Sequence, residues 1–166
     1  MSFALWLTGR PASGKSAIAR ELVRLLHDRG VDVSVLESDV MRTQLTPFPR
    51  YDDADRDFFY RTLAEIGAQL VKGGRPVVFD ATANRRAYRD AGRKAIERFA
   101  EVHVDTPLEI CKARDPKGLY RGGMTIDYET PLTPELVIHA AHASPVDAAR
   151  QVMVLLERRG WLDLHQ

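Results

Sequence analysis

The sequence is poor in cysteine, with Cys111 as the only one among 166 residues. A single thiol excludes an internal disulfide framework and a cysteine-based zinc site. Long hydrophobic runs are also missing, because the longest apolar stretches are short segments such as residues 3–7 and 76–79. About 20 apolar residues are needed to cross a bilayer, so we expect no membrane partner. The first residues show no basic, apolar and small-residue leader pattern, and a cytoplasmic location is the default expectation.

A strong excess of charge of either sign is absent as well. The formal net charge is +1, so no global field draws the chain toward nucleic acid or a membrane surface. Only five of the 24 basic residues are lysines; the rest are arginines, whose planar fork suits phosphate and sulfate recognition. The sequence shows no basic stripe with interleaved aromatic side chains, and we expect no nucleic-acid partner.

The first apolar segment leads into a glycine-rich motif. Residues 9–16 match the pattern G-x-x-x-x-G-K-[ST], between an expected buried strand and an expected amphipathic helix. In this pattern the glycines let backbone N–H groups wrap a phosphate, and the helix N-terminus adds positive potential. Lys15 is then predicted to reach the β- and γ-phosphates of ATP, with Ser16 as a ligand of Mg²⁺. The predicted ATP-binding residues of this segment are Gly9, Arg10, Pro11, Ala12, Ser13, Gly14, Lys15, Ser16 and Ala17.

Strand and helix patterns alternate along the chain. This alternation predicts an α/β fold of the three-layer P-loop NTPase type, with a parallel sheet of about five strands flanked by helices. We expect one P-loop kinase domain over residues 1–166, because no repeat, linker or low-complexity segment divides the sequence. The expected strands are 3–7, 31–35, 77–79 and 102–104, and the expected helices are 16–28, 54–72, 88–99 and 146–156.

Two aspartates follow expected strands. Asp39 comes after the second strand and Asp80 after the third, and ligands bind at the carboxyl ends of parallel strands. Asp39 is predicted to orient or deprotonate an acceptor hydroxyl or to help hold Mg²⁺, although it also suits the N-cap of a helix over residues 40–45. Asp80 suits a metal-shell carboxylate and a strand-end turn equally well. The sequence leaves open which of the two is the catalytic carboxylate.

Two arginines and a polar connection complete the predicted site. Arg42 lies one helical turn beyond Asp39 and is expected to face the same pocket, while Arg56 opens a long helix and is expected to clamp an anionic acceptor. Residues 114–134 are rich in Gly, Pro and charge, and long loops of this kind are typical of lids. His139 and His142 are spaced by three on an expected helix, but no further ligands are in place for a histidine metal site.

One string in the predicted lid is especially specific. Residues 114–120 read RDPKGLY, preceded by the strand-to-helix segment EVHVDTPLEIC at 101–111 and followed by Tyr128 and Glu129. This run closely resembles the adenylylsulfate kinase family, and the resemblance extends along the whole chain. It implies a P-loop kinase with a mobile lid, usually a homodimer. It also implies that ATP phosphorylates the 3′-hydroxyl of adenosine 5′-phosphosulfate, giving PAPS and ADP.

The resemblance assigns roles to individual positions. It implies ATP contacts from Arg114 and Lys117 in the lid. It further implies that Asp39, Arg42 and Arg56 face the nucleotide acceptor. Thr82, Lys117 and Met124 are also expected to contact this acceptor.

The acceptor side departs from the family pattern at several positions. Val40 stands where the family has Asn, and Phe58 and Phe59 replace the segment that carries an acceptor-contacting Asn. Met124 stands where a lid Phe stacks on the acceptor adenine, and the third strand ends in the string DATAN, where the family has an I-S-P type string. These changes keep two alternatives open. One is a related kinase for another nucleotide or a small hydroxylated metabolite; the other is a nucleotide-binding regulatory module without phosphotransfer.

Overall fold

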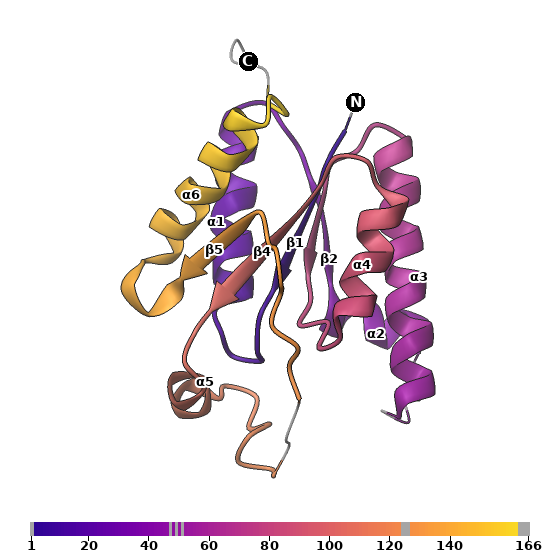
Figure 1. The fold of residues 1–166 in the computed structure, drawn as a ribbon, viewed down its shortest axis with the longest axis vertical. Coiled ribbons are helices and arrows are strands. Elements are labelled where there is room, and N and C mark those ends of the chain that lie inside the picture. The colour runs from indigo at the N-terminus through magenta and orange to yellow at the C-terminus, as the bar shows by residue number, and fades with distance from the viewer. Residues whose placement is uncertain (1, 47, 49, 51, 124–126, 163–166) are drawn as a thin grey trace.

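A single parallel sheet organises the chain. The computed structural model describes residues 2–46, 48, 50, 52–123 and 127–162 (Figure 1). Within them, five strands pair in parallel in the order β2-β3-β1-β4-β5. The chain therefore folds into an α/β structure with a parallel sheet, as the sequence predicted, and β1 lies at the centre of that sheet.

The helices and strands alternate along the chain. The strands are β1 (Ala4–Thr8), β2 (Ser34–Glu37), β3 (Val77–Asp80), β4 (Phe99–Asp105) and β5 (Leu136–His139). The helices are α1 (Lys15–Asp28), α2 (Ser38–Leu45), α3 (Asp53–Lys72), α4 (Arg86–Ala95), α5 (Leu108–Arg114) and α6 (Pro145–Arg158), with a short 3₁₀ turn at Ala140–His142.

The central strand explains why helices cover both faces of the sheet. Phe3, Leu5 and Leu7 pack in the hydrophobic cluster that includes α1 and α6, whereas Ala4 and Trp6 pack in the cluster that includes α3 and α4. Successive side chains of a strand point to opposite faces, and every residue of β1 is buried. Figure 1 shows the two helical layers on either side of the sheet. An uninterrupted apolar strand is typical of a parallel sheet that is covered on both faces.

The second strand lies later in the sequence than its valine alternation predicted. Ser34 is the register partner of Val77, the first residue of β3. Val31 and Val33 precede the ladder and pack, partly buried, against the cluster of α1 and α6. The prediction of a strand over 31–35 was wrong at its start, since the pairing begins at Ser34 and Val77. Residue 76 is a proline, which has no backbone N–H to extend the ladder.

Two further boundaries differ from the sequence prediction. The helix expected to reach Phe99 ends at Ala95, since Ile96 is already extended, with φ −126° and ψ 119°. Phe99 instead begins β4, opposite Ala4 of β1. His139, expected on a helix, is the last residue of the edge strand β5.

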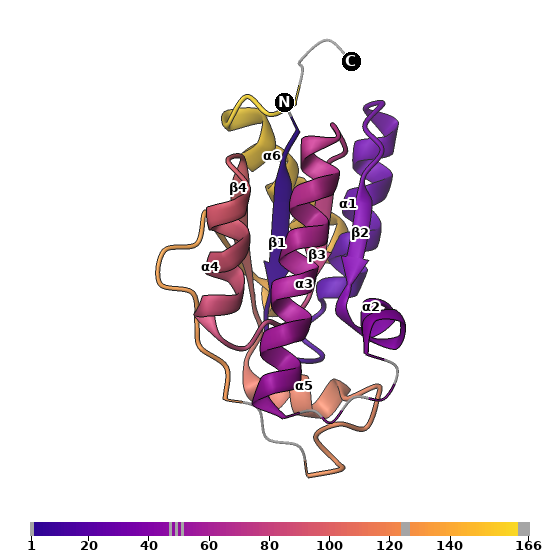
Figure 2. The same ribbon diagram turned by 90° about the vertical axis from the view of Figure 1, so that its right-hand side faces the viewer.

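The long connections gather at one end of the sheet. The segment 115–135 joins α5 to β5, and its residues 124–126 lie outside the described part. Figure 2 shows α2 and α5 at the same end, where the chain leaves β1 for α1. In the described part of the chain, none of the helices is long and apolar enough to cross a membrane.

Candidate active site

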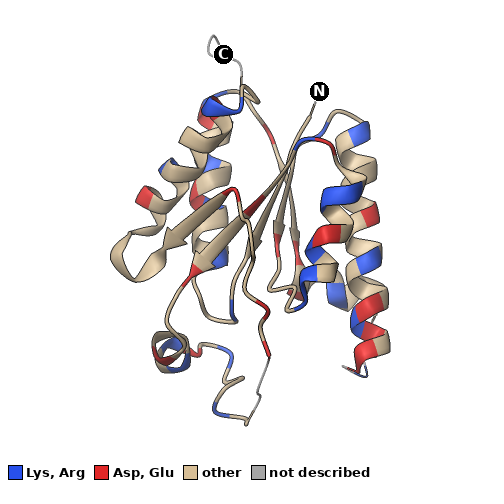
Figure 3. Cartoon of the chain, in the orientation of Figure 1, with Lys and Arg blue, Asp and Glu red and all other residues tan. Residues whose placement is uncertain are grey.

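A cavity of about 790 Å³ lies where the strands of the sheet end. Glu37 and Asp80 are the last residues of β2 and β3, and both line this cavity with the loop that follows β1. Figure 3 shows acidic residues at these strand ends and basic residues on the connections around them. Carboxyl ends of parallel strands are the usual ligand site in such folds.

The glycine-rich loop has the shape of a phosphate cradle. Gly14 has a φ of +104°, which side chains rarely allow. A Cβ at Gly9 would lie 2.6 Å from the carbonyl oxygen of Val104 and 2.7 Å from Ser13 Oγ, so only glycine fits there. Within the described part of the chain no side chain caps α1, and its first N–H groups lack intrahelical partners. They are therefore available to an anion.

Neighbouring segments fix the outside of this loop. The Thr106 hydroxyl, just after β4, donates to the Ser13 carbonyl at 2.8 Å. The Tyr120 hydroxyl, in the 115–135 connection, donates to the Pro11 carbonyl at 2.9 Å. Among the described residues, Ser13 Oγ is buried without a hydrogen-bond partner, which fits a loop shaped for a ligand.

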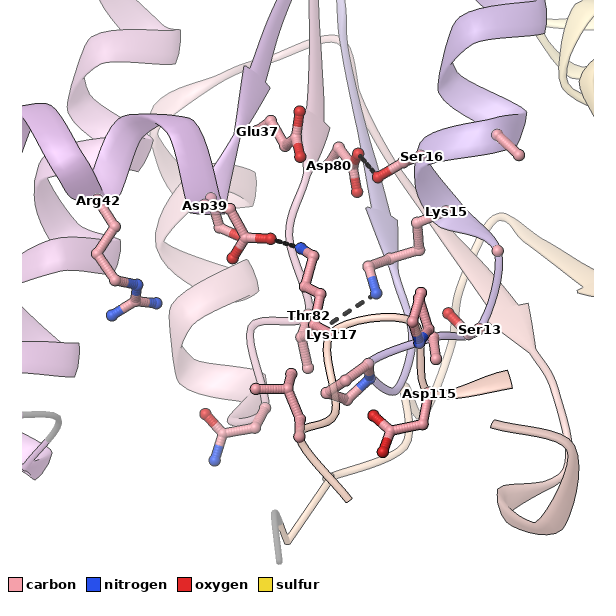
Figure 4. A pocket seen from close by; sticks show the side chains of 18 of the residues that line it. Ser13, Lys15, Ser16, Glu37, Asp39, Arg42, Asp80, Thr82, Asp115 and Lys117 are labelled. Carbon is pink, nitrogen blue, oxygen red and sulfur yellow. Dashed lines mark hydrogen bonds and ion pairs between the residues drawn. The ribbon is translucent and has the colours of Figure 1, made fainter. Parts of the chain in front are cut away.

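Lys15 is buried under the loop. Its Nζ donates to the carbonyl oxygens of Gly9 at 3.0 Å and Arg10 at 3.1 Å, and to Thr82 Oγ1 at 3.3 Å. Burial lowers the pKa of Lys15 to about 8, although the Asp80 carboxylate opposes this shift. The ammonium is therefore charged at neutral pH and held at the base of the cavity (Figure 4).

A hydroxyl and a carboxylate meet at the start of α1. Ser16 Oγ donates to Asp80 Oδ2 at 2.6 Å. Glu37 is the register partner of Asp80 on the neighbouring strand, and Figure 4 shows its carboxylate close by. This corner of the cavity gathers hard oxygen ligands suited to a divalent cation.

The second predicted carboxylate, Asp39, lies on α2, two residues beyond Glu37. Its Oδ2 forms an ion pair with Lys117 Nζ, which comes from the 115–135 connection (Figure 4). Both side chains are more than half exposed. Asp39 is the second residue of α2, whose N-cap is Glu37, so its expected alternative role as an N-cap was wrong.

The predicted acceptor arginines form a cationic wall backed by aromatic rings. The Arg42 guanidinium lies 4.3 Å from the ring centroid of Phe59. Burial raises the pKa of Tyr60, and the positive charges of Arg42 and Arg56 oppose this shift. The Tyr60 hydroxyl oxygen accepts from the backbone N–H of Ala83 at 3.2 Å. The aromatic side chains therefore connect α3 to both the arginines and the segment after β3.

The structure brings most of the predicted site residues together. Gly9 and Arg10 do not line the cavity, and Met124 lies outside the described residues. The predicted residues that do line it are Pro11, Ala12, Ser13, Gly14, Lys15, Ser16, Ala17, Asp39, Arg42, Arg56, Asp80, Thr82, Arg114 and Lys117.

Some lining residues were missed from the sequence. Glu37 ends β2 as Asp80 ends β3, so its position at a strand end was a signal. Tyr60 lies beside Phe59 on α3, and Asn84 is the last residue of the string DATAN after β3, and neither position had a sequence signal of its own. All three line the cavity.

The family comparisons agree with this geometry. The family profile described as adenylylsulphate kinase matches residues 1–139. The probable adenylyl-sulfate kinase of Archaeoglobus fulgidus is 35% identical over 148 residues, which cover 83% of this chain and 96% of that protein.

Solved structures show the same likeness. The Mycobacterium tuberculosis APS kinase CysC, in complex with AMPPNP and APS, is 34% identical with a TM-score of 0.86; the match covers 94% of this chain and 98% of that one. The hexameric APS kinase from Thiobacillus denitrificans is 29% identical with a TM-score of 0.79; the match covers 99% of this chain and 30% of that one.

Proposed function

The chain belongs to the adenylylsulfate kinase family, and we propose that it phosphorylates the 3′-hydroxyl of adenosine 5′-phosphosulfate with ATP. The products are PAPS and ADP. The observation that carries this proposal is that one cavity joins a phosphate cradle with a buried lysine to a wall bearing Arg42 and Arg56. Phosphoryl transfer needs a positioned donor, positive charge and an oriented hydroxyl in one place.

The cradle is proposed to bind the phosphates of ATP. Backbone N–H groups at the start of α1 bind the phosphate oxygens, and Lys15 supplies charge to the β- and γ-phosphates. Arg114 lies beside the loop, since a Cβ at Gly14 would be 3.6 Å from its Nη1. We propose that Arg114 and Lys117 extend this charge over the nucleotide.

The residues near Ser16 fit a Mg²⁺ ion bound together with ATP. Among the described residues, no group of three or more His, Cys, Asp or Glu is placed to hold a metal. Mg²⁺ commonly takes one or two carboxylates together with substrate phosphates, which matches Ser16 Oγ beside Asp80. An ion bound there would neutralise charge on the phosphates. We therefore propose Asp80 as the metal-side carboxylate.

Asp39 is then proposed to act on the acceptor. Its carboxylate faces the cavity across from Lys15 and is held by Lys117. The acceptor 3′-oxygen forms a bond to the γ-phosphorus as the bond to the β,γ-bridging oxygen breaks. ADP leaves with that electron pair, and the hydroxyl proton passes to Asp39. Arg42, Arg56 and Thr82 are proposed to orient the phosphosulfate nucleotide.

The test is coupled release of ADP with Mg-ATP, comparing adenylylsulfate with no acceptor. Turnover that depends on adenylylsulfate, with PAPS as the product, and that is abolished in Lys15→Ala, supports the proposal. ADP release that does not respond to adenylylsulfate would contradict it.

A second acceptor class has its own support. Phe59 packs against Arg42 where the family has a segment with an acceptor-contacting Asn, and Asn84 of the string DATAN lines the cavity. A panel of other nucleotides and hydroxylated metabolites in the same assay tests this candidate. Tight ATP binding without turnover on any acceptor would favour a nucleotide-binding module instead.

We further propose that residues 1–166 form one P-loop kinase domain that acts as a homodimer. Strands drawn from residues 4 to 139 share one sheet, which supports a single folding unit. The oligomeric state of the T. denitrificans relative supports self-association in the family. Size-exclusion chromatography with light scattering measures the mass of the assembly, and a monomeric mass would contradict the proposed dimer.

A further inference from the structure

Among the residues that the structure describes, the most deeply buried charged side chain outside the cavity lies on α4. The Arg89 side chain has an exposed fraction of 0%, and its Nε lies 3.3 Å from Glu101 Oε2 on β4. A buried guanidinium needs several hydrogen-bond acceptors, because its desolvation is costly. Three neighbours provide these acceptors. Arg89 donates to Thr8 Oγ1 at 3.2 Å, to the Tyr128 hydroxyl oxygen at 3.1 Å and to the Glu129 carbonyl.

The donors and acceptors of this cluster can be assigned in only one way. Thr8 Oγ1 lies 2.6 Å from the Thr82 carbonyl oxygen, which can only accept. The single hydroxyl proton of Thr8 is therefore used there. Tyr128 lies 2.8 Å from Thr8 Oγ1, so the phenol must donate to Thr8. Arg89 then donates to the remaining lone pairs of both oxygens.

The cluster continues into the phosphate site. Thr8 is the last residue of β1, directly before the glycine-rich loop. Its bond to the Thr82 carbonyl fixes the residue whose hydroxyl accepts from Lys15 Nζ at 3.3 Å. A series of hydrogen bonds therefore links Arg89 and Tyr128 to Thr8, Thr8 to the Thr82 carbonyl, and the Thr82 hydroxyl to Lys15.

The segment that carries Tyr128 is tied to the start of α4. The Glu129 backbone N–H donates to the Asn84 carbonyl at 2.8 Å. The Arg86 backbone N–H donates to Glu129 Oε1 at 2.9 Å, and Arg86 Nε donates to the Thr130 carbonyl at 2.8 Å. These contacts hold the Tyr128 backbone in place, so that its hydroxyl is presented to β1 at a fixed position.

We propose that Tyr128, held by Arg89, is a positioning residue for phosphoryl transfer. It acts through Thr8 and Thr82 to place the Lys15 ammonium on the phosphates. Tyr128 is not among the residues that line the cavity, so its effect is expected on donor binding and turnover, with the acceptor arginines left in place. The inference rests on the proposed function for its effect on turnover, and on nucleotide binding alone for its effect on the donor.

The test uses Tyr128→Phe in the full chain. This variant removes only the hydroxyl and keeps the ring. The centroid of that ring lies 5.6 Å from Arg10 Cζ and 5.9 Å from the centroid of the His103 ring. Tyr88→Phe is the matched control, because it removes another phenol from the same region, one that donates to Asp57 at 2.6 Å and is not in the series. Melting temperatures are measured for both variants, and all assays run well below them.

Calorimetry with AMPPNP and Mg²⁺ measures donor binding, and steady-state kinetics measure turnover. We expect Tyr128→Phe to weaken AMPPNP binding about fivefold and to lower kcat about tenfold, with KM for adenylylsulfate within about twofold. Tyr88→Phe is expected to leave all three within about twofold. Thr8→Val is expected to reproduce the Tyr128→Phe effect, and the double variant is expected to be no worse than either one, because the two side chains act as a unit.

Binding of AMPPNP needs no acceptor. Wild type that binds AMPPNP but does not turn over adenylylsulfate contradicts the proposed function, and the binding comparison then still decides this inference. The positioning role would be overturned if Tyr128→Phe had the same AMPPNP affinity as Tyr88→Phe and, where turnover is measurable, the same kcat. Strictly additive effects of Thr8→Val and Tyr128→Phe would overturn it as well.

Discussion

Ser16 Oγ and Asp80 Oδ2 lie 2.6 Å apart and join the first helix to the end of β3. Asp39 lies instead on α2, and its carboxylate is engaged by Lys117 (Figure 4). The two aspartates that the sequence could not rank are therefore separated by their partners. Asp80 is beside the Ser16 hydroxyl, which is proposed to bind Mg²⁺, and Asp39 is beside a cation from the 115–135 connection.

These different partners predict different defects for the asparagine variants of the two aspartates. Asp80→Asn is expected to raise the Mg²⁺ concentration needed for half-maximal activity about 10- to 100-fold, as loss of a metal-shell carboxylate does. Asp39→Asn is expected to leave the Mg²⁺ requirement unchanged and to lower kcat about 100- to 10,000-fold, as loss of a general base does. Activity as a function of Mg²⁺ concentration distinguishes them. The reverse pattern would exchange the two assignments.

ATP binding is predicted to weaken at alkaline pH. Burial lowers the pKa of Lys15 to about 8, so the unliganded protein loses this charge as the pH rises through that value. The phosphates bind the charged form and stabilise it, so binding takes up a proton above pH 8. The Kd of AMPPNP is therefore expected to rise by up to about tenfold per pH unit above pH 8.

Calorimetry between pH 7 and 10 measures this dependence. Lys15→Arg provides the control, because a guanidinium stays charged throughout this range. Its affinity is expected to be weaker and flat with pH. A wild-type profile as flat as that of Lys15→Arg would contradict the role given to Lys15.

Phe59 is predicted to support the acceptor side alone. Its ring lies 4.3 Å from the Arg42 guanidinium, and cation–π contacts of this kind contribute about 0.5–1 kcal/mol. Phe59→Leu is expected to raise KM for adenylylsulfate about two- to fivefold, with KM for ATP unchanged. In an Arg42→Ala background the same substitution should have no further effect on that KM. An equal effect in both backgrounds would show that Phe59 acts on packing.

The sequence predicted the strand, glycine-rich loop and helix around residues 9–16 well because the motif is local. Residues 9–16 carry their own geometry, which depends on glycine and on the helix that follows. The acceptor wall depends on long-range packing: Tyr60 reaches Ala83, 23 positions away. Periodicity alone cannot show that a helical aromatic residue faces a cavity.

Buried charge was the least predictable feature. Arg89 follows Tyr88 on α4, and a charged side chain on a helix is usually exposed. Its burial depends on acceptors from β1, β4 and the segment around Tyr128, which only the fold brings together. The edge strand β5 was missed for a related reason. Its four residues are short of a clear pattern, and their partner β4 lies far away in the sequence.

The glycine-rich loop makes a prediction for stability as well as for binding. A Cβ at Gly9 would lie 2.6 Å from the Val104 carbonyl oxygen, and this backbone atom belongs to the packed strand β4. Gly9→Ala is therefore expected to lower the free energy of unfolding by about 1–3 kcal/mol, the usual cost of overpacking. It should also weaken AMPPNP binding, because Gly9 is the first residue of the loop that is proposed to bind the phosphates.

Gly73→Ala is the matched control. Gly73 ends α3 with a φ of −75°, and a Cβ there would lie 3.4 Å from the nearest atom, the Leu70 carbonyl oxygen. Alanine fits this conformation and restricts the unfolded chain, so the expected change is a stabilisation of about 0.4–1 kcal/mol. Urea unfolding of both variants measures the two free energies. Equal changes at the two sites would mean that the Val104 contact yields without cost and that Gly9 is not required by the close approach of β4.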